Sequence, residues 1–309
     1  MWRFRAQDED LLQKTLPVDM REQQQSQATQ PWLVHSLPVN ALNFCAFSML
    51  FLDNQTAPDA SDAQPPGRAS LFAVPNALDS GAIDLFHLPR ETRLCTIPAG
   101  TAAQTGMVMA VALFYSSSRE LHVAAAYEDG QVMVFARRGA QDFSGNAISW
   151  KWEKVYVARP HSQPALSIDV FPAGGYFVSS SADALLVRHP VPGFGGATTL
   201  KTVDTKHSGQ QGLRIRSDGR VFATAGWDSR IRVYSCKTMR ELAVLKWHKE
   251  GCYAVAFADV ADSDVTTATK GDGEFSLATV QRQRNQKVQK THWLAAGSKD
   301  GKISLWDIY

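Results

Sequence analysis

Near the C-terminal end of the chain stand the three residue types of an acyl-transfer triad. His248, Ser298 and Asp300 could serve as base, nucleophile and orienting carboxylate, and Trp306 follows in the next strand-like run. A catalytic serine of this kind sits on a strained turn of the G-x-S-x-G type, which the sequence lacks. The same four side chains can instead share a buried hydrogen-bond network, which is stabilising when every member is paired. We expect this structural network, and we predict no catalytic residue and no enzyme activity.

Short hairpins are the elements that would position these side chains. The segment WLAAGSKDGKISLWDIY at 293–309 has the pattern strand, turn, strand. Asp-Gly pairs, which favour tight hairpin turns, occur at 129–130, 218–219 and 300–301. Three weaker copies of the hairpin keep the six-residue step from a turn aspartate to the second strand: Asp228 to Tyr234, Asp183 to His189 and Asp129 to Phe135. A repeated hairpin that ends in Trp-Asp, without helical periodicity, predicts an all-β WD-repeat β-propeller.

A propeller blade has four antiparallel strands, a to d, within about 40–45 residues. Candidate outer strands d lie at 93–97, 154–159, 199–203 and 242–246. In the three weaker hairpins Tyr, His or Phe replaces Trp, so we expect most blades to depend on packing rather than on the polar network. We predict five a–b–c triplets: 42–47, 71–75 and 83–87; 108–114, 121–126 and 131–136; 166–171, 176–180 and 185–189; 212–216, 221–225 and 231–234; 253–257, 293–297 and 303–306.

Both ends of the predicted propeller depart from a regular blade. The last blade has no fourth strand after Trp306, and an N-terminal strand commonly completes such a blade, which removes an exposed sheet edge. Segments 2–5 and 32–37 resemble strands c and d, so 1–37 indicates a partial blade with a Gln-rich loop. Segment 258–291 has the composition of a polar insertion in the last blade. We predict one propeller domain over 1–309.

The composition limits the classes of partner. Hydrophobic residues make up 44% and charged residues 20% of the chain, and the formal charge is +2, so no global field favours nucleic acid or an anionic membrane. The longest apolar runs, at 41–52 and 106–115, are shorter than the ~20 residues that span a bilayer. The four cysteines are scattered and no His or Cys pair has ligand spacing, so we predict no disulfide, no metal and no cofactor. We interpret the basic run QRQRNQKVQK, which has no interleaved aromatics, as a solvated loop rather than a nucleic-acid contact.

Aromatic residues in predicted turns are candidates for binding a protein partner, because aromatic side chains dominate interface hot spots. We name Trp227 and Tyr127 as such residues. Trp247 is a third turn aromatic, for which packing between blades is the competing interpretation. The segment GWDSR at 226–230 has the Trp-Asp-x-Arg pattern of ubiquitin-ligase adaptors. It lies in a b–c turn rather than at the end of strand c, which favours an ordinary turn with an exposed tryptophan.

Three segments carry a narrower resemblance. QPWLVHSLPVNALNFCAF at 30–47, AVPNALDSGAIDLFHLP at 73–89 and DGRVFATAGWDSRIRVYSCKTMRELAVLKWHKEGCYAVAF at 218–257 resemble the ASTRA-associated protein 1 family of fungi. The related animal protein is described as a G-protein β-subunit-like protein. The resemblance covers nearly the whole chain. Family members begin with about two further repeats, so the resemblance implies an N-terminally shortened form and leaves ring closure open.

The resemblance implies a seven-bladed propeller that acts as a non-enzymatic scaffold. The expected partners are protein subunits of the ASTRA complex, in chromatin remodelling, and the chaperone assembly that matures phosphatidylinositol-3-kinase-related kinases. It further implies a nuclear protein, with the cytoplasm as a second location, and no direct binding to nucleic acid or membrane. The alternative is a G-protein β-like signalling or adaptor subunit. Against it, the sequence has no N-terminal heptads of the kind that pair with a γ chain.

Overall fold

The computed structural model describes residues 2–3, 32–40, 44–52, 69–99, 105–116, 118–139, 150–193, 200–259 and 291–308. All regular secondary structure within these ranges is β-strand, and every strand pairing is antiparallel. No described segment forms a helix long and apolar enough to cross a membrane. The all-β prediction is therefore confirmed.

Five sheets follow one another along the chain, and we call them the first to fifth blades. The first four have four strands each, and the fifth has three. Their strands are β3 (Ser48–Phe51), β4 (Ser70–Pro75), β5 (Ile83–Leu88) and β6 (Thr92–Ile97); β7 (Val108–Tyr115), β8 (Leu121–Tyr127), β9 (Val132–Arg138) and β10 (Lys151–Ala158); β11 (Ala165–Val170), β12 (Tyr176–Ser181), β13 (Leu185–Pro190) and β14 (Lys201–Asp204); β15 (Gln210–Ile215), β16 (Val221–Gly226), β17 (Arg230–Ser235) and β18 (Glu241–Lys246); β19 (Cys252–Phe257), β20 (Trp293–Ser298) and β21 (Ile303–Asp307).

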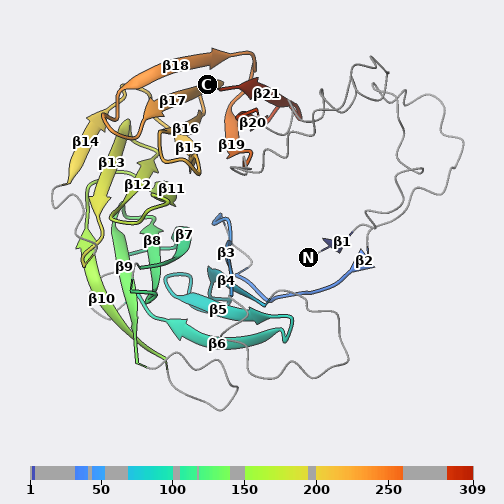
Figure 1. Ribbon diagram of the computed structural model, residues 1–309, viewed down its shortest axis with the longest axis vertical. Helices are drawn as coiled ribbons and strands as arrows, with labels where there is room; N and C mark the ends of the chain where they lie inside the picture. The colour runs from blue at the N-terminus through green and yellow to red at the C-terminus, as the bar shows by residue number, and fades with distance from the viewer. Residues whose placement is uncertain are drawn as a thin grey trace, which may run out of the picture.

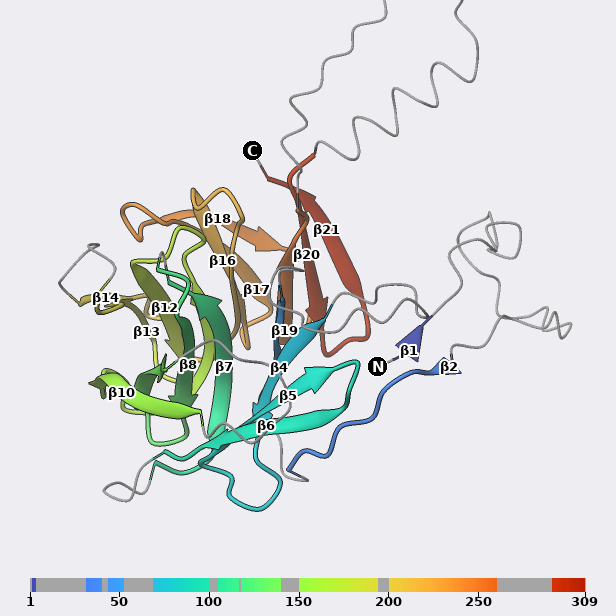
Figure 2. The ribbon, with the colours of Figure 1, turned by 60° about the horizontal axis from the view of Figure 1, so that its bottom comes forward.

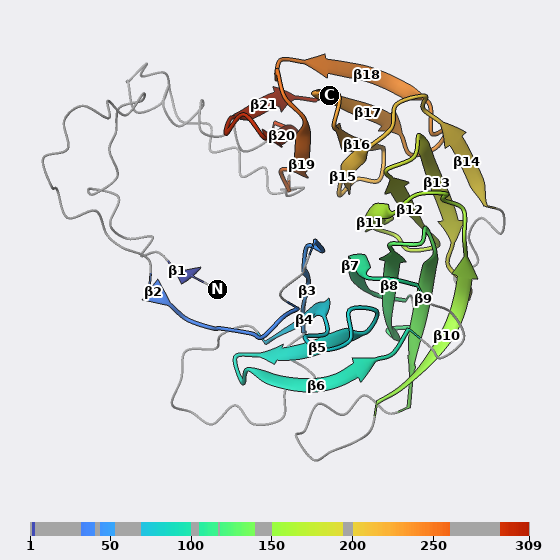
Figure 3. The same ribbon diagram turned by 180° about the vertical axis from the view of Figure 1, so that it is seen from behind.

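The blades stand side by side in an arc. Figure 1 shows β3, β7, β11, β15 and β19 on the inside of this arc and β6, β10, β14 and β18 on the outside. The inner strands contact one another in chain order, β3 with β7, β7 with β11, β11 with β15 and β15 with β19. A small sheet of β1 (Trp2–Arg3) and β2 (Trp32–Leu33) stands apart from the blades (Figures 1, 2 and 3). Blades, strand order and arc together are those of a β-propeller.

The core lies in layers between neighbouring blades. Strands β4, β5, β8 and β16 are buried at every position. For β8 and β16 the reason is a neighbouring blade on both faces, whereas in the first blade Leu37 packs against the face that the second blade does not cover. Their sequences are mostly apolar rather than alternating, and polar residues among them, such as Asp84 on β5, are also buried. One layer packs Leu71 and Leu85 of the first blade with Val123 of the second. Full burial of each such side chain contributes about 1.5–3 kcal/mol, so each blade is stabilised largely by the next.

The inner strand of the first blade corrects one prediction. We expected it at 42–47, and the structure has β3 at Ser48–Phe51, while Phe44 and Phe47 are mainly exposed. The register pairs Ser48 with Ala73, so an extension toward Phe47 would soon oppose Pro75. Proline has no N–H to continue a ladder. The apolar run alone did not indicate this limit.

The two ends of the chain differ from the prediction in one respect. β1 and β2 pair with each other as expected, over two residues each. Within the described strands, however, β21 pairs with β20 alone, and no N-terminal strand lies beside it. The Gln-rich loop and nearly all of the predicted insertion, at 260–290, lie outside the described residues. The single-domain assignment stays a prediction.

The b–c turns of the second and fifth blades close on glycines with positive φ. Gly130 has φ +86 and Gly301 has φ +74, and each donates its N–H to a carbonyl three residues earlier. Their surroundings differ. A Cβ on Gly130 would lie 2.3 Å from the His161 carbonyl oxygen, in the turn that leads to the third blade, whereas a Cβ on Gly301 meets nothing within 4 Å.

This difference predicts unequal costs for the same substitution. Gly301→Ala adds only the left-handed backbone strain, about 1 kcal/mol. Gly130→Ala adds a clash with backbone that cannot rotate away, so we expect a loss of about 3 kcal/mol or more. Urea unfolding of the two variants and the wild type measures both values. Equal losses would show that the two turns do not differ in packing.

Candidate functional site

The third blade contains a continuous chain of polar side chains at its junction with the second blade. Tyr156, on β10, lies 3.0 Å through its hydroxyl from His189 Nδ1. His189 Nε2 lies 2.8 Å from Ser179 Oγ, which lies 2.8 Å from His161 Nε2. His161 Nδ1 is 3.2 Å from both carboxylate oxygens of Asp183. Five side chains from two strands of this blade, its b–c turn and the end of the second blade thus form one network.

The hydrogen bonds of this network have a single consistent direction. An ionised Asp183 can only accept, so His161 carries its proton on Nδ1 and accepts from Ser179 at Nε2. Ser179 then accepts from His189 Nε2–H, which leaves Nδ1 of His189 to accept from the Tyr156 hydroxyl. Every member is satisfied while both histidines are neutral. A proton added to either histidine would turn its acceptor nitrogen into a donor, and the hydroxyl that faces this nitrogen would lose the acceptor for its own hydrogen.

Burial keeps both histidines neutral. His161 and His189 have 2% and 0% of their surface exposed. Burial, and to a smaller extent the neighbouring His161, lower the pKa of His189 to about 3. Burial also lowers the pKa of His161, although Asp183 opposes this effect. These groups are therefore poor proton carriers near neutral pH, and their contribution is structural.

The fifth blade contains the network predicted around His248, with one change of residue. His248 Nδ1 lies 3.5 Å from Asp300 Oδ1 without forming a hydrogen bond, and its Nε2 lies 2.9 Å from Ser304 Oγ. The indole N–H of Trp306 donates to the same hydroxyl at 2.8 Å. Ser304 thus takes the place that we expected for Ser298. It lies on β21, two residues before Trp306 and on the same face of the strand.

Ser298 has a different contact, which recurs in the third blade. Its hydroxyl lies 3.1 Å from the carbonyl oxygens of Glu250 and Gly251, in the turn that enters the fifth blade. Ser181, at the matching position of the third blade, makes the same two bonds to Gln163 and Pro164. In both blades this serine therefore joins the end of strand b, through hydrogen bonds, to the turn that precedes strand a.

The hydroxyl of the network therefore comes from either of two facing positions. In the third blade it is Ser179 on strand b, which faces Val187 on strand c. In the fifth blade strand b has Ala296, and the facing residue on strand c is Ser304. Only the strand register reveals this exchange. The expectation that blades without Trp depend on packing alone is wrong for the third blade, where His189 replaces Trp.

The fourth blade satisfies its turn aspartate with a cation instead. Arg232, on β17, places its two terminal nitrogens 3.1 Å and 2.5 Å from the carboxylate oxygens of Asp228. Although burial opposes the effect, this guanidinium holds the pKa of Asp228 below its ordinary value. On strand b, Thr224 donates to the side chain of Gln210 at 2.6 Å. No acyl-transfer geometry arises here either.

The aromatic candidates for partner binding differ in how far they are exposed to solvent. Tyr127 is fully buried in the layer between the first and second blades, so the prediction that it contacts a partner is wrong. It ends β8, and its ring enters the core rather than the turn. Trp227 is 45% exposed and Trp247 is 53% exposed. Both remain on the surface, and for Trp247 the interpretation as a residue packed between blades is wrong.

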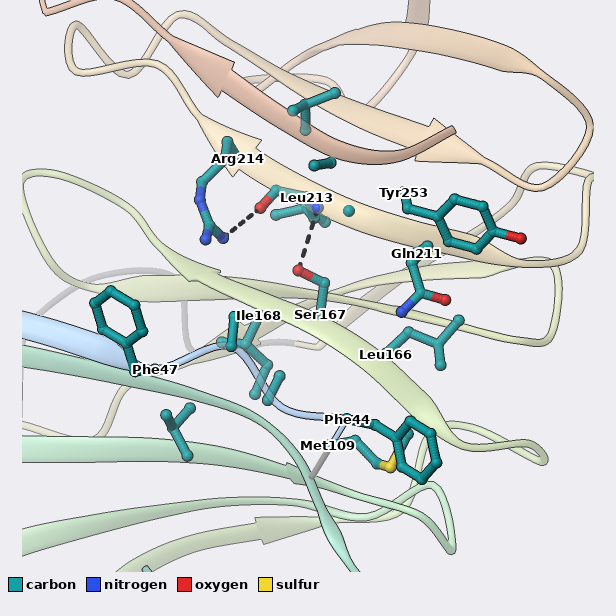
Figure 4. Close-up of a pocket in the computed structure, with 16 residues that line it drawn as sticks. Phe44, Phe47, Met109, Leu166, Ser167, Ile168, Gln211, Leu213, Arg214 and Tyr253 are labelled. Atoms are coloured by element: carbon teal, nitrogen blue, oxygen red, sulfur yellow. Dashed lines mark hydrogen bonds between the residues drawn. The ribbon is translucent and has the colours of Figure 1, made fainter. Parts of the chain in front are cut away.

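A cavity of about 230 Å³ lies between the inner strands β7, β11, β15 and β19 and the segment 44–47, which precedes β3 (Figure 4). Its wall is about equally polar and apolar, with Phe44, Met109, Ile168 and Leu213 among the lining residues. Three polar side chains of the wall are engaged: Ser167 accepts from the Leu213 N–H, Arg214 donates to the Leu213 carbonyl, and Gln211 accepts from the indole N–H of Trp227. In the described part of the chain, no cluster of His, Cys, Asp and Glu has the geometry of a metal site.

The exchange of hydroxyl position predicts a rescue. Ser304→Ala leaves His248 and Trp306 without a buried partner, and we expect it to cost about 1–3 kcal/mol. Adding Ala296→Ser supplies a hydroxyl from the facing position that the third blade uses. We expect the double variant to regain most of the loss, as measured by urea unfolding. Ala295→Ser/Ser304→Ala, whose new hydroxyl lies on the other face of β20, is the control and should give no recovery.

The low pKa of His189 predicts a pH-dependent stability. The unfolded chain takes up a proton near pH 6.5 and the folded chain only near pH 3, so the contribution is complete above about pH 7 and is lost as the pH falls. At about pH 5 the loss through His189 alone is about 2 kcal/mol. His189→Gln cannot take up this proton, so its stability should fall less between these pH values. Parallel profiles would contradict the assignment.

Comparison with known proteins agrees with this architecture. The WD domain, G-beta repeat family matches residues 198–235 and 288–307. The chain is similar to ASTRA-associated protein 1 of Aspergillus flavus, with 75% identity over all of this chain and 79% of the relative. It is similar to the protein of the same name in Schizosaccharomyces pombe, with 30% identity over 89% of this chain and 67% of the relative. The mouse guanine nucleotide-binding protein subunit beta-like protein 1 is 28% identical over 90% of this chain and 68% of its own. The chain belongs to the ASTRA-associated protein 1 family of WD-repeat proteins, as its sequence resemblance predicted.

Proposed function

We propose that this chain is a non-enzymatic scaffold that associates with the protein subunits of the ASTRA complex. One observation carries the proposal: a relative named ASTRA-associated protein 1 is 75% identical over the whole length of this chain. Identity at this level includes the strands that form the blades and the turns that join them. We therefore expect the two proteins to present similar surfaces.

The geometry supports a scaffold rather than an enzyme. The groups that could perform acyl transfer by residue type are buried and hydrogen-bonded in pairs, His161 with Ser179 and His248 with Ser304. Exposed side chains of large size lie in turns and at blade surfaces, among them Trp227 and Trp247. A rigid propeller with such turns is suited to docking other proteins.

The finer part of the proposal follows from the family resemblance. The scaffold would act in chromatin remodelling and with the chaperone assembly that matures phosphatidylinositol-3-kinase-related kinases. It would reside in the nucleus, with the cytoplasm as a second location, and bind neither nucleic acid nor membrane directly. The mouse relative's name supports one alternative, a G-protein β-like signalling or adaptor subunit.

Affinity purification distinguishes the two functions. The tagged full chain, expressed in fungal cells, should recover ASTRA subunits and kinase-maturation chaperones, identified by mass spectrometry. Lys237→Glu, in the exposed c–d turn of the fourth blade, is the matched surface variant and should recover the same proteins. Recovery of a small coiled-coil chain in place of ASTRA subunits would favour the G-protein β-like alternative.

A further inference from the structure

Three exposed aromatic side chains gather on the turns that join the fourth and fifth blades. Trp227 lies in the b–c turn of the fourth blade, Trp247 directly follows β18, and Tyr253 is the second residue of β19. Their exposed fractions are 45%, 53% and 44%. Together with Lys249, Lys299 and Lys302 they form what we call the Trp227–Lys302 surface.

Trp227 is held in place although it is exposed. Its indole N–H donates to the Gln211 side chain at 3.0 Å, and its backbone N–H donates to the Gly209 carbonyl at 3.0 Å. Its ring lies directly on Gly209, where an added Cβ would come within 2.2 Å of the ring atoms. The Trp227 side chain therefore loses little conformational freedom when a partner binds it, which favours affinity.

The turn from Trp247 to Gly251 connects the rest of the surface. A Cβ on Gly251 would lie 3.3 Å from both Trp227 Cα and the Tyr253 hydroxyl, so these two residues meet at this glycine. The Lys299 N–H donates to the Gly251 carbonyl at 2.9 Å, which brings the b–c turn of the fifth blade against it. Lys302 lies 5.8 Å from the centre of the Trp247 ring. Figure 4 shows the Tyr253 hydroxyl pointing away from the central cavity.

The aspartates of this surface have partners within the turns, whereas its lysines form no ion pair in the described part of the chain. Asp228 binds Arg232, and Asp300 accepts from the Lys302 N–H and lies beside His248, so both carboxylates are engaged inside the turns. The ammonium groups of the three lysines are on exposed residues, and none forms an ion pair within the described part of the chain. Glu250 and Asp300 oppose these three lysines, and the partly exposed Arg230, at the end of the turn that contains Trp227, is a fourth cation. Four cations and two carboxylates leave an excess of two positive charges around the aromatic groups, since Asp228 and Arg232 cancel each other.

We propose that the Trp227–Lys302 surface binds an acidic segment of a protein partner, in which carboxylates flank an apolar or aromatic side chain. The apolar side chain would pack on the indole of Trp227 and the ring of Tyr253, and the carboxylates would pair with Lys249 and Lys302. The inference rests on the proposed role as a protein scaffold and names the chemistry of one of its contacts. An excess of two charges suits a short acidic peptide, whereas a nucleic acid requires several neutralised phosphates and would be repelled by Glu250.

A direct binding measurement tests the proposal on the full chain. The probe is a short fluorescent peptide in which glutamates flank a pair of leucines, compared with the same peptide carrying lysine for every glutamate. Fluorescence anisotropy at low salt should show binding of the acidic peptide alone. Lys249→Glu/Lys302→Glu should weaken it about tenfold or more, and Tyr253→Ser should weaken it without changing its salt dependence.

A matched variant controls for the change of charge itself. Lys237→Glu/Arg240→Glu makes the same change of charge in the c–d turn, at the opposite end of the fourth blade, and should leave the affinity unchanged. Circular dichroism of every variant checks the fold. Failure of the wild type to bind the acidic peptide, equal weakening by both charge variants, or tighter binding of single-stranded DNA would overturn the proposal.

The same variants separate this inference from the proposed function. Recovery of ASTRA subunits by the wild type, without acidic-peptide binding, would refute the surface and leave the scaffold in place. Peptide binding that depends on Lys249 and Lys302, without recovery of ASTRA subunits, would support the surface and refute the association with ASTRA.

Discussion

The structure depends on the burial of each blade between its neighbours. A sheet that is covered on both faces has apolar residues at consecutive positions, and its remaining polar groups must find partners at the junctions. The Leu113 N–H donates to Ser48 of the preceding blade, and the Leu213 N–H donates to Ser167 in the same way. The hydrogen-bonded side chains from Tyr156 to Asp183 cross the junction between the second and third blades, farther from the inner strands. Packing and polar pairing are thus two parts of one constraint, and both bind a blade to the next.

This constraint gives side chains of catalytic type a structural role in the third blade. Histidine, serine and aspartate act in catalysis when a substrate reaches them and when their pKa values allow proton transfer. In the third blade they are buried, bonded in one direction and held neutral at both histidines. The same residue types that suggest a triad by spacing therefore provide cohesion between strands. The proposed recognition surface lies instead on exposed turns, which contain Trp227, Lys249 and Lys302.

The features that the sequence predicted correctly are those that depend on residues close together in the chain. Strands b and c of every blade were located from apolar runs and from turn residues, because a hairpin is a local element. The exchange of Ser298 for Ser304 could not be predicted, since it depends on which residues face each other across β20 and β21. The burial of Tyr127 was missed because a residue at the end of a strand can point into the core or outward. The start of β3 was missed because its limit is set by Pro75 on another strand.

The two facing positions of the network hydroxyl have a consequence for how such repeats diverge. A blade that gains serine at the position of Ser304 before it loses serine at the position of Ser179 keeps a bonded histidine at every step. The reverse order passes through a blade with an unsatisfied buried histidine, which is costly. The strand register therefore allows serine to move from strand b to strand c without a loss of stability at any step. The two sequence patterns look unrelated when repeats are aligned residue by residue. Degenerate repeats of this kind can hide an intact hydrogen-bond network.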